Sequence, residues 1–65
     1  MKKIIDAATG TTEDVAMYAR DSITKKEVLI STDEYNVSCP TDEQIIYAQD
    51  ELGKTADIYF FEAVV

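Results

Sequence analysis

The sequence of 65 residues contains no histidine, no tryptophan and one cysteine, Cys39. Without histidine, no imidazole can act as general base for a serine or cysteine nucleophile. One cysteine cannot form a disulfide within the chain, and it is too few for a zinc site built from Cys and His ligands. A single unpaired cysteine is also typical of a reducing compartment, so we expect a cytoplasmic protein.

Glycines and long apolar runs are also scarce. Gly10 and Gly53 are the only glycines, and no phosphate-binding or nucleophile motif occurs. No stretch approaches the ~20 apolar residues of a membrane-spanning helix. These absences predict a protein that is not an enzyme, needs no metal or cofactor, and does not enter a membrane.

Basic residues are rare in the second part of the chain. Residues 1–26 hold five basic and four acidic residues, whereas residues 27–65 hold nine acidic residues and Lys54 alone, for a net charge of −7. Nucleic acids and anionic membranes are bound through Lys and Arg, so direct binding to either is not expected. The acidic excess fits a solubilising surface, or a surface that meets a basic protein.

The clearest local pattern predicts a helix over residues 41–53. Thr41 and Gln44 have the spacing of a capping box, in which each side chain bonds the backbone N–H of the other residue. Two acidic residues follow in the first turn, where the helix dipole favours them. Gly53 supplies the residue type that most often ends a helix.

An internal comparison predicts a second helix over residues 12–24. Thr12–Lys25 aligns with Thr41–Lys54, and five of the aligned pairs are identical. They are Thr12/Thr41, Tyr18/Tyr47, Ala19/Ala48, Asp21/Asp50 and Lys25/Lys54. If one segment is helical, the other is expected to be helical too. The weak alternation of Val15–Ala19 favours a strand instead, and this alternative stays open.

Apolar alternation and β-branched or aromatic residues predict strands at residues 2–8, 27–32, 35–39 and 57–65. The order β-α-β-β-α-β predicts one α+β domain over residues 1–65, a split-βαβ or ferredoxin-like sandwich of two helices on an antiparallel sheet. Two pseudo-repeats, residues 2–31 and 34–65, would make up this domain. The alternative is a β-meander followed by one helix (41–53) and a last strand.

The last predicted strand is apolar on both faces. Helices in a split-βαβ fold cover only one face of the sheet, so the other face is expected to meet a partner. We predict a homodimer that buries Ile58, Phe60 and Val64. The set Tyr59, Phe61 and Ala63 remains the alternative interface, and Glu62 on the first set favours that set as the outward one.

The outer faces of the two predicted helices are the candidate partner-binding sites. Each would carry an apolar residue between two acids: Asp14, Met17 and Asp21 on the first, and Glu43, Ile46 and Asp50 on the second. Such a face suits a basic protein surface.

We therefore expect a small acidic interaction module that regulates or inhibits a basic partner, for example as a nucleic-acid mimic. In size and charge alone it resembles small acidic inhibitors made by phages. The alternatives are a subunit of a homo-oligomeric assembly and a small-ligand-sensing module.

Overall fold

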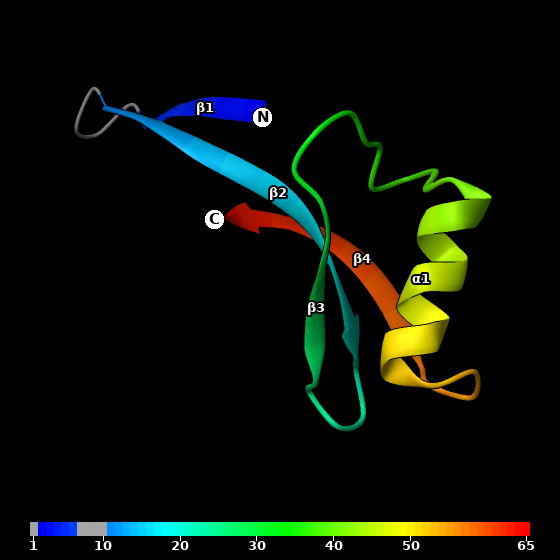
Figure 1. The fold of residues 1–65 in the computed structure, drawn as a ribbon. Helices are drawn as coiled ribbons and strands as arrows, with labels where there is room; N and C mark the ends of the chain where they lie inside the picture. Colours follow the sequence, from blue (N-terminus) through cyan, green and yellow to red (C-terminus); the bar gives the residue numbers. More distant parts are fainter. Residues whose placement is uncertain (1, 7–10) are drawn as a thin grey trace.

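The computed structural model describes residues 2–6 and 11–65. Within this part of the chain, four strands and one helix follow in the order β1 (Lys2–Asp6), β2 (Thr11–Asp21), β3 (Glu27–Ser31), α1 (Asp42–Leu52) and β4 (Ile58–Val64) (Figure 1). All described strand pairs are antiparallel. The architecture is therefore one antiparallel sheet with a single helix packed against it.

Strand β2 is the centre of the sheet, because every other described strand pairs with it. Val15 lies opposite Lys2 of β1 and also opposite Val64 of β4, so β1 and β4 occupy opposite edges of β2. Strand β3 pairs with the second half of β2, beyond β1. A β-bulge between Met17 and Tyr18 shifts the β2–β3 register.

The predicted helix over residues 12–24 is wrong, and with it the ferredoxin-like sandwich. Residues 12–21 belong to the strand β2 and residues 22–24 to the turn after it, so the two segments aligned in the internal comparison have different conformations. Val15, Ala16, Met17 and Ala19 are all buried, whereas an amphipathic helix would bury only one side. Pairing along both edges decides the conformation here and outweighs the helix propensity of alanine and methionine. The alternative prediction, a meander with one helix and a last strand, fits the structure.

The strand predicted at residues 35–39 is also absent from the sheet. The side chain of Asn36 accepts a hydrogen bond of 2.9 Å from the Ser38 N–H, and its carbonyl accepts one of 3.0 Å from the Cys39 N–H. Asparagine readily forms such turns because its side chain replaces a backbone partner. The alternating pattern of Tyr35, Val37 and Cys39 therefore lies in a turn.

The remaining elements agree with the sequence predictions within one or two residues. The helix begins after Thr41 and ends before Gly53, and β3 and β4 fall inside their predicted ranges. Strand β1 matches the described part of the strand predicted at 2–8, of which residues 7 and 8 lie outside the described residues. Gly53 adopts a φ of 110°, which explains why glycine ends the helix.

The small core lies between α1 and one face of the sheet. On that face Met17 and Ala19 are fully buried, and Ala48 of α1 is buried as well. The connection from β3 to α1 reaches the same face, where the Tyr35 hydroxyl donates a hydrogen bond of 2.7 Å to Glu62 of β4. The sheet thus has one covered face and one face turned away from the helix.

The molecule is elongated, with extents of 41, 22 and 16 Å. Figure 1 shows why: β1 and the first part of β2 extend beyond the body formed by β3, β4 and α1. In the part of the chain that the structure describes, no helix has the length and apolar character needed to cross a membrane.

Candidate functional site

The outer side of α1 carries the candidate site, which we call the acidic helix stripe. It consists of Glu43, Ile46, Tyr47 and Asp50, which are all exposed and follow the i, i+3, i+4, i+7 spacing of one helix side. Ile46 is 56% exposed and Tyr47 is 45% exposed. Two apolar side chains therefore lie in solvent between two carboxylates.

Local chemistry fixes the position of this stripe on the helix. The Gln44 N–H donates a hydrogen bond of 3.2 Å to Thr41 Oγ1, and the Thr41 N–H donates one of 3.0 Å to Gln44 Oε1. This capping box sets where α1 begins. Ala48 then faces the sheet, which turns Ile46 and Tyr47 outward.

The charge of α1 is unfavourable at its C-terminal end. Asp50 and Glu51 lie in the last turn, and no basic residue is present there. The negative end of the helix dipole disfavours carboxylates at this position by about 0.3–1 kcal/mol each. Lys54, two residues after the end of α1, offsets part of this electrostatic cost, and a further cation would relieve the rest.

The structure brings together only one of the two predicted partner-binding sets. Glu43, Ile46 and Asp50 share the outer side of α1, as described above. Asp14, Met17 and Asp21 lie along β2 and form no helical face. Met17 is 0% exposed and Asp21 is buried, so neither is on the surface of the single chain.

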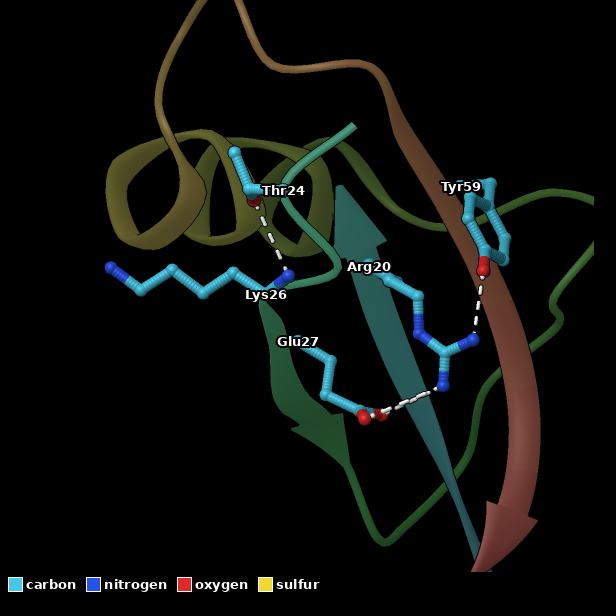
Figure 2. Close-up of polar contacts among 5 residues, drawn as sticks. All are labelled: Arg20, Thr24, Lys26, Glu27 and Tyr59. Atoms are coloured by element: carbon cyan, nitrogen blue, oxygen red, sulfur yellow. Dashed lines mark hydrogen bonds and ion pairs between the residues drawn. The ribbon is translucent and has the colours of Figure 1, made fainter. Parts of the chain in front are cut away.

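Asp21 has a structural role at the β2–β3 turn. Its carboxylate accepts a hydrogen bond of 2.9 Å from the Ile23 N–H. This bond, with smaller contributions from Thr24 and Asp57, lowers the pKa of Asp21. In the same turn the Lys26 N–H donates to Thr24 Oγ1 at 3.3 Å (Figure 2). The carboxylate thus stabilises a turn and is not available as a partner-binding group.

The sheet face turned away from α1 carries a second cluster, which we call the aromatic sheet face. Its members come from the three strands of the body and share one side of the sheet by their register. They are Tyr18, Arg20, Glu27, Leu29, Tyr59 and Phe61. The rings of Tyr18 and Phe61 stack with centroids 5.7 Å apart, and those of Tyr59 and Phe61 lie 5.8 Å apart.

Arg20 joins the members of this face to one another. Its guanidinium donates a hydrogen bond of 3.0 Å to the Tyr59 hydroxyl and forms an ion pair of 3.3 Å with Glu27 (Figure 2). The guanidinium carbon also lies 4.7 Å from the centroid of the Phe61 ring, within cation–π range. The bond to Tyr59 is the main cause that raises the pKa of Arg20, and Glu27 adds to it. The arginine is therefore held in one place.

The residues predicted for a dimer interface lie on the other side of β4. Ile58 and Phe60 pair with Asp21 and Ala19, so they share the face that α1 covers, and both are half-buried. Val64 is on the same side but is 53% exposed, near the end of the strand. The outward face of β4 is the alternative set, with Tyr59 and Phe61 at its centre.

Sequence reasoning missed Tyr47, Tyr18 and Arg20. Tyr47 could have been found from helical spacing, because it lies four residues after Glu43 and three before Asp50. Tyr18 and Arg20 required β2 to be recognised as a strand, since only a period of two puts both on the face of Tyr59 and Phe61.

Groups able to hold a metal ion are lacking among the described residues, where no three His, Cys, Asp or Glu side chains gather. Cys39 is exposed and has no disulfide partner. No protein-family model, curated protein or solved structure matches the chain.

Proposed function

We propose that this protein is a non-catalytic binding module whose acidic helix stripe docks on a basic surface of another protein and thereby regulates or inhibits it. The observation that carries the proposal is the exposure of Ile46 and Tyr47 between Glu43 and Asp50. Interfaces are built from desolvated apolar anchors surrounded by polar groups, and aromatic residues are enriched among such anchors.

The unfavourable charge at the end of α1 supports the same role. Features that lower local stability are expected mainly at functional sites. Lys or Arg side chains of a partner would relieve the repulsion between the helix dipole and the carboxylates of Asp50 and Glu51. The stripe therefore gains more from a basic partner than an ordinary solvated helix would.

The helix geometry defines what the partner must present. Glu43 and Asp50 are seven residues apart on α1, which corresponds to about 10 Å along the helix axis. We expect basic side chains at about this spacing on either side of an apolar recess that receives Ile46 and Tyr47. A nucleic-acid-binding protein offers such a surface, and the module would then compete with nucleic acid for it.

The ligand-sensing alternative loses its basis, because it depended on a ferredoxin-like scaffold that the structure does not have. Assembly of several copies is supported by a different surface, the aromatic sheet face.

The test compares two doubly neutralised variants in affinity capture from cell extract, with the captured proteins quantified by mass spectrometry. Glu43→Gln/Asp50→Asn removes two charges from the stripe, whereas Asp33→Asn/Glu34→Gln removes two exposed charges outside it. We expect the first pair to weaken capture of the partner about 10-fold, since each lost charge pair contributes about 0.2–1 kcal/mol. The second pair should have little effect.

Ile46→Ala supplies an independent measurement, because it removes the apolar anchor without changing the charge. Capture should weaken with rising NaCl for the native protein and should also weaken in Ile46→Ala at every salt concentration. If both neutralised pairs reduce capture equally, the acidic surface acts only through overall charge. That result, or unchanged capture by Ile46→Ala, would contradict docking through the stripe.

A further inference from the structure

Among the residues that the structure describes, no helix or strand covers the aromatic sheet face. Leu29 is 43% exposed and Tyr59 is 41% exposed, and α1 lies against the other side of the sheet. Aromatic side chains and arginine are the residue types most enriched at the centres of protein interfaces. This face therefore has the composition of an interface and not of a solvated sheet.

The charge on this face is balanced, in contrast to the rest of the molecule. Arg20 and Glu27 are its two charged residues, and they pair with each other at 3.3 Å. The whole chain has a net charge of −7. Two copies that approach through this face avoid bringing their acidic surfaces together, whereas approach through α1 would oppose like charges.

The small core points in the same direction. Among the residues whose burial the structure describes, the fully buried side chains are few and mostly small, so the core of one copy is limited. Domains of this size commonly complete their apolar burial by association.

From these observations we infer that two copies of the chain dock through the aromatic sheet face and form a two-fold symmetric dimer. In a two-fold contact the same patch is used by both copies, so a patch must complement itself. The aromatic sheet face meets this condition, because it carries one cation and one anion, and Arg20 of one copy can face Glu27 of the other. Its rings and Leu29 supply the apolar contact.

The dimer would turn both acidic helix stripes outward, on opposite sides. Each particle would then present two copies of the stripe, and a partner with two basic patches would be held more strongly than by one stripe. The dimer itself does not depend on the proposed function, because a different surface forms it.

Sedimentation equilibrium in reducing buffer tests the inference, since reducing agent prevents a disulfide through the exposed Cys39. At about 100 µM, where a dimer of micromolar affinity is mostly formed, the native chain should have twice its mass of 7.3 kDa. Leu29→Glu and Tyr59→Glu should each weaken the dimer by about 100-fold, since each puts an unpaired charge into the contact.

Val37→Glu is the matched control, because Val37 is 38% exposed and lies in the β3–α1 connection, outside the aromatic sheet face. This variant should remain dimeric.

An NMR measurement on the native chain tests the same contact without depending on whether a variant folds. Isotope-filtered NOEs should connect the Leu29 methyl groups of one copy to the rings of Tyr59 or Phe61 of the other copy. A native chain that sediments as a monomer at this concentration overturns the inference. So does a dimer that survives both Leu29→Glu and Tyr59→Glu.

Discussion

Tyr35 is the residue that ties the β3–α1 connection to the sheet. Its hydroxyl donates a hydrogen bond of 2.7 Å to the carboxylate of Glu62. Desolvation, followed in size by the hydrogen bond to Glu62 and the negative charge of Glu62, raises the pKa of Tyr35 to about 12. The folded state therefore holds the phenol proton more tightly than the unfolded chain, whose tyrosine pKa is about 10.

We predict that the stabilising contribution of Tyr35 is complete below about pH 10 and is lost as the pH rises from 10 to 12. In urea unfolding at pH 8, Tyr35→Phe should lower the free energy of unfolding by about 0.5–1.5 kcal/mol. The difference between the native chain and the variant should shrink as the pH rises toward 12. Tyr47→Phe on the exposed side of α1 controls for the loss of one phenol, and a difference that stays constant with pH would contradict the prediction.

At the scale of elements, the capping box determines the start of α1. Thr41 and Gln44 bond each other's backbone N–H groups through their side chains. Such a cap contributes typically about 1 kcal/mol to the stability of a helix.

Thr41→Ala is therefore expected to lower the free energy of unfolding by about 1 kcal/mol. Thr41→Ser keeps the hydroxyl and should retain most of the stability. Both variants are measured by urea unfolding, with the far-ultraviolet signal reporting the helix. Equal losses in Thr41→Ala and Thr41→Ser would show that the threonine methyl group, and not the hydrogen bond, matters at this position.

The helix α1 could be predicted from the sequence because its signals are local. Thr41, Gln44 and Gly53 act within a few residues of the helix ends, so their effect does not depend on the rest of the fold. The outer side of α1, with Glu43, Ile46 and Asp50, could be predicted for the same reason.

Strand β2 could be predicted from the sequence only as an alternative, because distant residues decide its conformation. Tyr18 pairs with Leu29 on one edge and with Phe61 on the other, and neither partner is visible from the residues around Tyr18. The likeness of residues 12–25 to 41–54 favoured a helix, but pairing along both edges makes β2 a strand and buries its central residues. The aromatic sheet face was missed for this reason, since it exists only if β2 is a strand.

At the scale of the whole molecule, the acidic excess affects stability as well as binding. A net charge of −7 on 65 residues repels itself in the compact state, and dissolved ions screen this repulsion. We predict that raising NaCl from low to physiological concentration and above raises the melting temperature. A gain of about 1 kcal/mol corresponds to about 4–8 °C for a domain of this size.

The salt effect is measured by thermal unfolding at constant pH. Asp33→Asn/Glu34→Gln carries two fewer negative charges and should depend less on NaCl than the native chain does. A melting temperature that falls with added salt would mean that ion pairs such as Arg20–Glu27 outweigh the general repulsion.

The central position of β2 also has a consequence for biosynthesis. Its ladder with β4 joins Asp21 to Ile58 and Val15 to Val64. One edge of β2 therefore stays unpaired until residues at least 37 positions further along the chain have been synthesised. At translation rates of about 5–20 residues per second, that interval is about 2–7 s. During this time that edge of β2 is unpaired on the nascent chain, the arrangement that invites pairing between neighbouring chains. Pairing with β4 therefore closes an edge of β2 that would otherwise be open to other chains.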